Sequence, residues 1–380
     1  MNRRIRAAAI AAPDAPVALI DLPVPRLEPG AALLRTLYSE VCGTDVHLQH
    51  GRLTGVPYPL VPGHVSIGHV EALNGAVVDV DGRPFREGDL VTFLDVHETC
   101  NACYACLVAK QTTRCPKRKV YGITYGAADG PLGGWATHIW MKPGVKMIRL
   151  PQALVPEAFI GGGCGLVTAL HAIDRAEIRL GQSVAVLGAG PVGQSVIALA
   201  RLSGAGEVIA IDREASRLEY ASRMGASEAH RLPRQSDDGT TARRHASEPI
   251  RSLGADIGQL TRGRGVDVAI EASGAPAAVS MALDLVRDGG RVVVCGHYTD
   301  NGPVEIHPHF QVNRKHVEIR GVWGSDYSHF HRAVEIVARH GATVPWAEMV
   351  SRTYPLDKAG EALAAVERRE VLKALIGPNT

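Results

Sequence analysis

Four cysteines lie close together in the sequence, with spacing typical of a metal site. Cys100, Cys103, Cys106 and Cys115 are separated by two, two and eight residues. Two-residue gaps bring successive sulfurs round a tight turn, and the longer gap lets the chain return to close a tetrahedron. Four thiolates saturate zinc and leave no open position. The set therefore predicts a structural zinc, held by a lobe near residues 97–116.

Other uses of these cysteines are less consistent with the sequence. Disulfides are typical of secreted chains, but the apolar run Ala7–Ala12 is short for a secretion signal and meets Pro13. We interpret it as a first strand, with a processed leader as the alternative. An iron–sulfur cluster of the two-cluster type would need a Pro-flanked partner run, which the sequence lacks. A nucleic-acid-binding zinc ribbon is disfavoured by 41 Lys and Arg against 39 Asp and Glu.

A glycine-rich segment, LGAGPVG, places Gly188, Gly190 and Gly193 in the order Gly-x-Gly-x-x-Gly. It follows a strand-like apolar run and opens a stretch with helical spacing, the context in which this motif binds a dinucleotide. Gly188 permits a tight turn, Gly190 lets the backbone approach a pyrophosphate, and Gly193 lets helix and strand pack closely. Pro191 suits the first helical turn, whose free N–H groups would face the phosphates. A doubly wound domain without nucleotide is the alternative.

Asp212 ends the next strand-like run, 24 positions after Gly188. A carboxylate there accepts hydrogen bonds from a ribose diol and repels a 2′-phosphate, so it favours NAD over NADP. Arg213 and Arg217 follow closely and would weaken that preference. The alternative is that Asp212 is a turn or cap residue.

Three further candidate ligands are far apart in the sequence. Cys42 lies in VCGTDVHLQHG, His64 in PGHVSIGHV and Cys164 in GGGCGLVTAL. Two thiolates and one imidazole would leave the fourth position of a tetrahedral zinc open for water or substrate, as in catalytic sites. Taken singly each residue is unremarkable, because a lone cysteine is more often a core residue.

Two residues of the same types are expected to be structural. His69 lies in the strand-like run after His64 and is predicted to be structural or at a pocket edge. Cys295 lies in the apolar run RVVVCG and is predicted to be a core residue.

The elements that must position these residues are of two kinds. The first 150 residues contain short, often alternating apolar runs between Gly and Pro, which predicts β structure. Beyond about Ala158, strand-like apolar runs alternate with helical stretches, which predicts a parallel sheet covered on both faces. The polar segment 232–249 has no apolar periodicity and is expected to be a surface insertion, with a phosphate-binding arginine loop as the alternative.

Composition limits the class of protein. The 380 residues, 46% of them hydrophobic, are enough for two domains. A net charge of +2 gives no indication of a nucleic-acid or membrane-surface partner. No apolar run approaches the roughly 20 residues that a membrane span needs. We therefore expect a cytoplasmic protein that acts on small molecules.

Together these motifs resemble those of the zinc-containing medium-chain alcohol dehydrogenases, over essentially the whole chain. The motifs are the C-G-T-D-x-H segment, the P-G-H segment, the four-cysteine lobe, the C-G-x-x-T segment and GAGPVG with Asp212, in that order. The resemblance implies an α/β protein with two domains. A GroES-like β-barrel catalytic domain would comprise residues 1–160 and 325–380, and a Rossmann NAD-binding domain with a doubly wound parallel sheet would comprise residues 161–324.

The resemblance also implies roles for individual residues. By motif match, Cys42, His64 and Cys164 take the catalytic-zinc positions, and Thr44 and His47 take those of a proton relay. The implied cofactor-binding residues are Thr168, Gly188, Gly190, Pro191, Val192, Gly193, Asp212, Arg213, Arg217 and, on a loose C-terminal match, Lys373. Each chain would hold two zinc ions, one catalytic and one structural, and would bind NAD(H) in preference to NADP(H).

The expected chemistry is hydride transfer between a secondary alcohol or polyol, or the matching ketone or aldehyde, and NAD(H). Zinc lowers the pKa of a bound alcohol, whose carbon gives hydride to the nicotinamide. Thr44 would pass the proton to the ribose and then to His47. Asp45 would accept the other N–H of a ligand histidine. The alternatives are a turn or cap residue for Asp45 and a surface histidine for His47.

Two features depart from the family pattern. The four-cysteine lobe has eight residues in its last gap, where seven is usual. Val65 follows His64, where the family usually has an acid. Because that acid is missing, we expect a less anionic and more apolar environment around the catalytic metal.

Two other functions remain open. One is an NADPH-dependent reductase of activated carbonyls or double bonds on the same fold. The other is a non-catalytic nucleotide-binding protein. For the enzyme we expect a homodimer or homotetramer.

Overall fold

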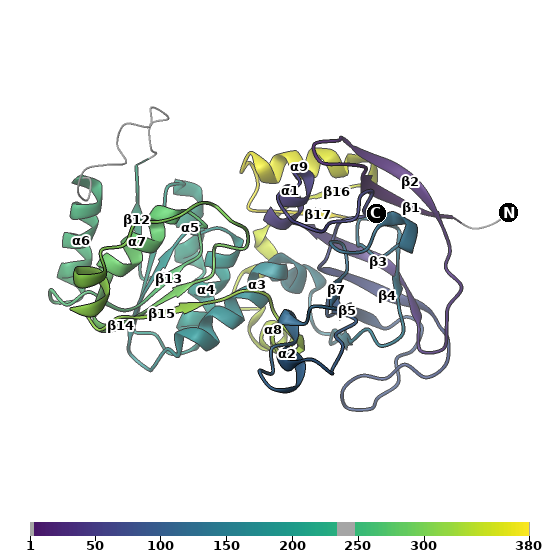
Figure 1. Ribbon diagram of the computed structural model, residues 1–380, viewed down its shortest axis with the longest axis horizontal. Coiled ribbons are helices and arrows are strands. Elements are labelled where there is room, and N and C mark those ends of the chain that lie inside the picture. Colours follow the sequence, from purple (N-terminus) through teal and green to yellow (C-terminus); the bar gives the residue numbers. More distant parts are fainter. Residues whose placement is uncertain (1–3, 234–247, 380) are drawn as a thin grey trace. The chain divides into compact units, whose positions relative to one another are not determined.

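The computed structural model describes residues 4–233 and 248–379. They form two compact units (Figure 1). The described residues of one unit fall within 1–164 and 324–380, and those of the other fall within 165–323. The boundaries expected from the sequence fall four residues and one residue from these. The predicted insertion at 232–249 lies largely outside the described residues.

The first unit is built around one long central strand. β3 (Ala32–Val41) pairs along one edge with β4 (Ser66–Leu73). Along its other edge it pairs with β8 (His138–Met141) near its start and with β17 (Lys373–Ile376) near its end. The end of β3 therefore lies between the segment that leads into β4 and the C-terminal strand.

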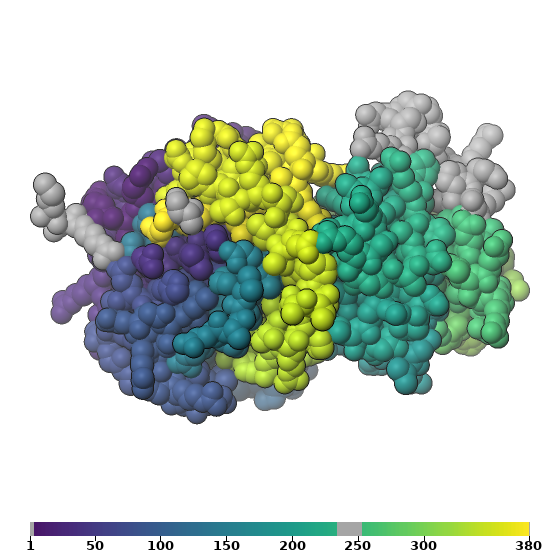
Figure 2. Space-filling view, turned by 180° about the vertical axis from the view of Figure 1, so that it is seen from behind, coloured from purple at the N-terminus to yellow at the C-terminus, as the bar shows by residue number. Residues whose placement is uncertain are grey.

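Other strands extend this sheet, whose order is β16-β17-β3-β4-β5-β9. The C-terminal segment that supplies β16 and β17 lies against the N-terminal segments of the same unit, yellow beside purple and blue in Figure 2. The remaining elements of the unit are β1 (Arg4–Ile10), β2 (Val17–Pro23), α1 (Gly43–Gln49), β5 (Leu90–Phe93), β6 (Val96–His97), α2 (Tyr104–Leu107), η1 (Thr112–Arg114), β7 (Lys119–Val120), η2 (Ala127–Asp129), β9 (Met147–Arg149), α8 (Tyr327–His340), η4 (Trp346–Met349), β16 (Val350–Tyr354), η5 (Leu356–Lys358) and α9 (Ala359–Glu367).

The second unit is a parallel sheet with the order β12-β11-β10-β13-β14-β15. Most residues of its inner strands are apolar and buried, as expected for strands covered on both faces. The order reverses beside β10, and in such sheets ligands bind beyond the carboxyl ends of the strands at this point. The elements are β10 (Ser183–Leu187), α4 (Pro191–Leu202), β11 (Glu207–Asp212), α5 (Ala215–Arg223), β12 (Glu228–Arg231), α6 (Glu248–Leu260), β13 (Val266–Glu271), α7 (Pro276–Leu285), β14 (Val286–Val294), η3 (Pro308–Asn313) and β15 (Glu318–Gly321).

Helix α3 (Pro156–Ala176) contains the boundary between the units and is interrupted at Gly163, whose φ of 48° and ψ of −140° are not helical. Among the described residues, no helix is both long and apolar enough to cross a membrane.

Candidate metal and cofactor sites

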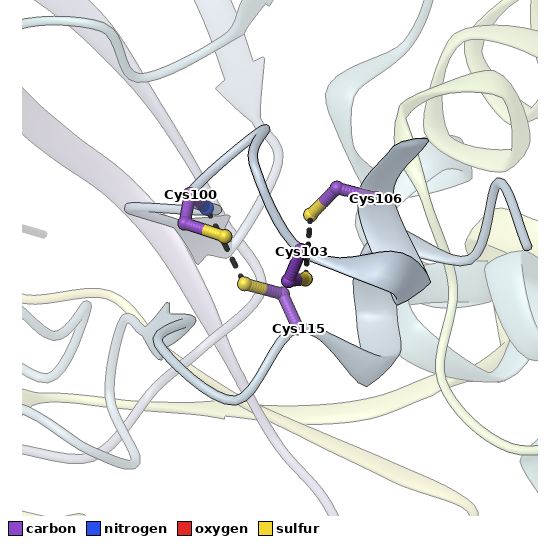
Figure 3. Close-up of side chains that lie close together, drawn as sticks. All are labelled: Cys100, Cys103, Cys106 and Cys115. Atoms are coloured by element: carbon purple, nitrogen blue, oxygen red, sulfur yellow. Dashed lines mark hydrogen bonds between the residues drawn. The ribbon is translucent and has the colours of Figure 1, made fainter. Parts of the chain in front are cut away.

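The four cysteines of the lobe come together as predicted (Figure 3). Their Sγ atoms all lie within 4.8 Å of one another. Cys103 caps the short helix α2, which contains Cys106, and Cys115 follows η1. The two sulfurs on the short helical turn, those of Cys103 and Cys106, are 3.6 Å apart.

These thiols fit a zinc ion. Zn–S bonds of about 2.3 Å in a tetrahedron place the sulfurs about 3.8 Å apart, close to the spacing found here. The backbone N–H of Cys100 donates to Cys115 Sγ at 3.3 Å. This bond lowers the pKa of the Cys115 thiol to about 6, which favours the thiolate that a metal binds.

Cys42 stands where β3 ends and α1 begins. Its backbone N–H donates to Asp45 Oδ2 at 2.9 Å, and its Sγ accepts from the N–H of Thr44 at 3.3 Å. These two bonds form a capping box, with cysteine in the place usually taken by serine or threonine. The helix start therefore fixes the direction of the thiol.

His64 is held in a tight segment before β4. Gly63 has φ of 93°, and a Cβ there would lie 2.4 Å from Ser39 Oγ. The N–H of Gly134 donates to Gly63 O at 2.8 Å, and the N–H of Trp135 donates to Pro62 O at 3.0 Å. Backbone hydrogen bonds from a neighbouring loop thus hold the Pro-Gly-His segment in place. His64 itself is buried.

Cys164 follows the interruption of α3 at Gly163. The interruption leaves the N–H of Cys164 outside the helical pattern, and this N–H donates to both carboxylate oxygens of Glu40, at 3.2 and 3.1 Å. A Cβ on Gly163 would lie 1.7 Å from Glu40 Oε2, so only glycine fits at this position.

Ligand atoms of Cys42, His64 and Cys164 lie within 4.8 Å of one another and of a carboxylate oxygen of Glu40. Glu40 Oε1 is 4.0 Å from His64 Nε2, and Glu40 Oε2 is 2.7 Å from Lys373 Nζ. Glu40 and Lys373 are both fully buried. Two thiols, one imidazole and a carboxylate form a donor set that suits zinc.

The charges in this cluster support one another. A hydrogen bond with the Cys164 thiol lowers the pKa of Cys42 to about 6, and the same bond raises the pKa of Cys164. Burial opposes charging of His64, but Cys42, Asp45 and Glu40 raise its pKa to about 9. Burial also opposes ionisation of Glu40, yet Lys373 and then His64 lower its pKa.

Asp45 lies at the edge of this cluster and is fully buried. The structure shows it as a cap for the N–H of Cys42. Its other oxygen, Oδ1, and His64 Nδ1 are buried without a hydrogen-bond partner among the described residues. The predicted bond between Asp45 and His64 therefore stays a prediction, although both unsatisfied atoms belong to the residues it would join.

The two predicted relay residues lie on one helix. Thr44 and His47 are in α1, three positions apart, and residues at this spacing share a helix face. Burial, with Arg52 and His50 nearby, lowers the pKa of His47. A neutral imidazole at pH 7 is the form that accepts a proton.

In the second unit the glycine motif lies between β10 and α4. Gly188 has φ of 100°, and a Cβ on Gly193 would lie 1.8 Å from Gly188 O. Gly190 caps α4, which begins at Pro191 and continues through Val192. A Cβ on Gly190 would meet nothing closer than Arg217 Nη1 at 3.7 Å. The approach to the Gly190 backbone is therefore open on that side, as phosphate binding at a helix N-terminus requires.

Asp212 ends β11 beside this loop. Its Oδ2 accepts from the N–H of Ala189 at 2.6 Å, and its Oδ1 accepts from the N–H groups of Arg213 and Glu214 at 2.7 and 2.9 Å. Asp212 therefore does act as a turn or cap residue, the alternative interpretation of this position. Binding a ribose would be an additional role.

Thr168 lies three residues after Gly165 on α3. A Cβ on Gly165 would lie 2.9 Å from the carbonyl carbon of Pro191, so this face of α3 contacts the start of α4. Residues three apart share a helix face, which places Thr168 on the side of α3 next to the glycine motif.

Comparison with known proteins shows the family of the chain. A family model described as "Alcohol dehydrogenase GroES-like domain" matches residues 28–152, and one described as "Zinc-binding dehydrogenase" matches residues 191–339. 5-exo-Hydroxycamphor dehydrogenase of Pseudomonas putida is 31% identical over 94% of this chain and 94% of its own length. Sorbitol dehydrogenase of Bacillus subtilis is 28% identical over 94% and 93%. The crystal structure of an alcohol dehydrogenase from Thermotoga maritima, 30% identical, covers 99% of this chain and 100% of its own, with a TM-score of 0.91.

The chain belongs to the zinc-containing medium-chain alcohol dehydrogenases. The predicted fold class, a GroES-like domain with a Rossmann domain, is confirmed. Zinc and a nicotinamide cofactor are the cofactors of this family.

One expectation about this alcohol dehydrogenase is wrong. Because Val65 replaces an acid, the metal environment was expected to be less anionic and more apolar. Glu40 instead supplies a buried carboxylate to the ligand cluster. The N–H of Glu40 donates to Val65 O at 3.1 Å, so the two positions are neighbours on adjacent chain segments. The ligand cluster therefore contains a carboxylate, but it comes from the segment of Glu40 and not from the segment of Val65.

Sequence reasoning missed Glu40, although its position held a signal. It is a charged residue near the end of β3, between buried neighbours and two positions before a predicted ligand. Lys373, predicted to reach a pyrophosphate, is placed against Glu40, and contact with the cofactor stays a prediction. His69 is outside the ligand cluster, and its Nδ1 contacts Gly88 O at 3.1 Å. Cys295 is buried, as predicted.

Proposed function

We propose that this alcohol dehydrogenase transfers hydride between NAD(H) and a secondary alcohol or polyol, or the matching ketone or aldehyde. The observation that carries the proposal is the cluster of Cys42, His64 and Cys164, whose ligand atoms lie within 4.8 Å of one another. The names of its relatives support the substrate class, because they include dehydrogenases of hydroxycamphor and sorbitol.

Cys42, His64 and Cys164 would hold the catalytic zinc, and the four-cysteine lobe would hold the structural one. Bound zinc supplies a Lewis acid that lowers the pKa of an alcohol and polarises a carbonyl. The lobe has four thiols and no open position, so it would stabilise the fold and leave the chemistry to the Cys42 site.

Thr44 and His47 would move the proton that the alcohol loses. Thr44 Oγ1 would accept this proton as it gives up its own, because a hydroxyl is both donor and acceptor. The ring of His47, with its lowered pKa, is neutral near pH 7 and would receive the proton at the surface side of α1.

The glycine motif and Asp212 would bind the coenzyme. NAD bound there would accept the hydride. The preference for NAD rests on Asp212, since a carboxylate repels a 2′-phosphate. Arg217, whose Nη1 lies close to Gly190, acts in the opposite direction and makes a direct comparison of coenzymes necessary.

The proposal is tested by metal analysis and turnover on one preparation. We expect two zinc ions per chain and reduction of NAD with a panel of secondary alcohols and polyols. The same panel assayed with NADP should give a lower kcat/KM. A zinc-loaded, folded protein that turns over no alcohol or carbonyl with either coenzyme would contradict the proposal. Preference for NADP on activated carbonyls or double bonds would favour the alternative reductase.

A homodimer or homotetramer in the cytoplasm is part of this proposal. Sedimentation or light scattering of the purified protein would test the assembly.

A further inference from the structure

A buried carboxylate lies at the carboxyl end of β13, in the half of the parallel sheet away from the glycine motif. Glu271 is the last residue of β13 and is fully buried. A dinucleotide binds across the point where the strand order reverses, with one nucleotide over each half of such a sheet. The glycine motif and Asp212 follow β10 and β11, where the adenosine half would bind. The half made of β13, β14 and β15 would therefore face the nicotinamide.

The Glu271 carboxylate accepts hydrogen bonds from two loops. In the loop after β13, Oε1 accepts from the N–H of Ser273 at 2.7 Å, from Ser273 Oγ at 2.9 Å and from the N–H of Gly274 at 2.7 Å. In the loop after β14, the N–H of Gly296 donates to Oε2 and to Glu271 O, both at 3.1 Å. His297 Nε2 is 3.9 Å from Oε2, too far for a hydrogen bond. The carboxylate therefore joins the two loops through backbone and hydroxyl donors.

Glycines let these loops approach closely around the carboxylate. A Cβ on Gly296 would lie 2.7 Å from Glu271 Oε1 and closer still to the backbone nitrogen of Gly274. A Cβ on Gly274, whose φ is 72°, would lie 2.8 Å from Gly296 O. The loop after β13 also contacts the glycine motif, because a Cβ on Gly188 would lie 2.7 Å from Ser273 Cα. Glu271 thus lies where the loops after β10, β13 and β14 meet.

We propose that Glu271 is a positioning residue for the nicotinamide half of the coenzyme: its carboxylate holds the loops after β13 and β14 in the arrangement that binds this half. The inference rests on the proposed function, since it requires a nicotinamide coenzyme. It gives the carboxylate a role in binding that it performs through the two loops, without touching the coenzyme itself.

The adenosine half should not depend on this carboxylate, because the glycine turn has supports of its own. The N–H of Gly188 donates to Ile211 O at 2.8 Å. The N–H of Ala189 donates to Asp212 Oδ2 at 2.6 Å. Both bonds run to β11, on the other side of β10 from β13. Loss of the Glu271 carboxylate should therefore weaken binding of one half of the coenzyme and spare the other.

The competing explanation is that Glu271 supports only the sheet, as Asp267 does near the amino end of β13. Asp267 Oδ2 accepts from the N–H and the Oγ of Ser183 at 2.8 and 2.9 Å, and Oδ1 accepts from Arg287 Nε at 2.7 Å. Asp267 thus joins β10 to β14, as a carboxylate on the same strand as Glu271. It lies at the edge of the sheet opposite the one where ligands bind. Asp267→Asn is therefore the matched control for Glu271→Gln.

The experiment measures binding of NADH, and of ADP-ribose, which lacks the nicotinamide, to wild type, Glu271→Gln and Asp267→Asn. A glutamine keeps one acceptor oxygen for the loop after β13 but turns its NH2 group toward the N–H of Gly296. Two donors would then face each other, which should push the loop after β14 away. We expect Glu271→Gln to bind NADH about 10- to 100-fold more weakly, the range that one unpaired buried donor produces, and ADP-ribose nearly as wild type does. Asp267→Asn should lower Tm and leave both affinities unchanged.

Glu271→Asp is the second variant, and thermal melts show whether each variant has folded. Its shorter side chain keeps the charge but cannot reach both loops, so the same selective loss of NADH affinity is expected. Equal losses for NADH and ADP-ribose, or no loss for either, would overturn the inference and leave the proposed function intact. Failure of both Glu271 variants to fold would also overturn it, because the carboxylate would then support the fold as a whole. Wild type that binds neither NADH nor NADPH would instead reject the proposed function.

Discussion

The four-cysteine lobe and the Cys42 site both collect sulfur ligands, but they take them from very different lengths of chain. The lobe takes four from residues 100–115, within one loop and two short helical turns. The Cys42 site takes its ligands from the end of β3, the segment before β4 and the interrupted helix α3. The first site is local, and the second exists only when the sheet and the helix are in place.

The two sites also differ in what surrounds the ligands. In the lobe the four thiols lie together, and a backbone N–H donates to one of them. The Cys42 site has two buried carboxylates, Glu40 and Asp45, and the buried ammonium of Lys373. Four thiolates saturate zinc without any other ligand. A metal site with an open position also depends on the groups around its ligands, which orient the ligands and tune the metal. Mutations should therefore separate stability from chemistry.

The largest expected effect is on turnover. Cys42→Ser removes a ligand of the catalytic site, and loss of about 4 kcal/mol of transition-state stabilisation corresponds to a roughly 1000-fold lower kcat/KM. NAD binding, measured by fluorescence titration, should be unchanged because the glycine motif belongs to the other unit.

Cys295→Ser is the matched control for that change. Cys295 is buried and its thiol contacts Glu271 O at 3.1 Å, a bond that a serine hydroxyl also makes. It should keep both zinc ions and most activity. Equal activity of Cys42→Ser and Cys295→Ser would show that the Cys42 site is not catalytic.

The next effect is on stability. Cys103→Ser opens the lobe, and loss of a metal is among the changes that cost about 4 kcal/mol or more. For a domain of this size that lowers Tm by roughly 8 to 16 °C. The variant should hold one zinc less, while kcat of the folded fraction, assayed well below its Tm, should stay within a few-fold of wild type. A loss of kcat as large as that of Cys42→Ser would remove the distinction between the sites.

The same contrast explains what the sequence could predict. Spacing alone predicts the lobe, because all its ligands lie on one excursion of the chain. The apolar runs and the glycine motif predict the parallel sheet, because strand-like apolar runs that alternate with helical stretches indicate strands covered on both faces. The Cys42 ligands were found through resemblance, since nothing local relates Cys42 to Cys164.

Glu40 could not be placed from the sequence for a related reason. Its partner Lys373 is separated from it by almost the whole chain, and they meet because β17 pairs with β3, with Leu375 opposite Glu40. Val65 showed that the acid usual at its position is missing. The carboxylate comes instead from Glu40 on the neighbouring segment. Such a replacement can be seen only when the pairing of the two segments in space is known.

A smaller effect is expected from Gly163→Ala. The position has φ of 48°, which costs a non-glycine residue about 1 to 2 kcal/mol, and the added Cβ would also collide with Glu40. Zinc at the Cys42 site should bind more weakly and Tm should fall, while zinc in the lobe stays bound.

Gly55→Ala separates the two causes. Gly55 has φ of 74° in the same unit, and a Cβ there would meet nothing within 4 Å. It should lose stability through backbone strain alone and keep its catalytic zinc. If Gly163→Ala behaves like Gly55→Ala in zinc titrations, the space beside Glu40 has no importance for the metal.

The smallest effect concerns a support of the Cys42 site that lies away from the ligands. His50 caps the C-terminal end of α1, the helix that begins at Cys42, and its ring contacts Asp14 at 2.6 Å and Glu367 at 2.7 Å. Glu367 first, and then Asp14, raise the pKa of His50. Because the folded pKa is raised, the protonated ring stabilises the fold below its unfolded pKa of about 6.5, and this stabilisation is lost as pH rises through the folded pKa.

His50→Gln should therefore lower the free energy of unfolding at pH 6 and have little effect at pH 9. Both acids are largely exposed, so the difference should be at most about 1 kcal/mol and should shrink in high salt. Urea unfolding of both proteins at several pH values measures it. A difference that does not change with pH would mean that His50 acts through neutral hydrogen bonds. Zinc binding by the four-cysteine lobe should not change, because His50, Asp14 and Glu367 all lie outside that lobe.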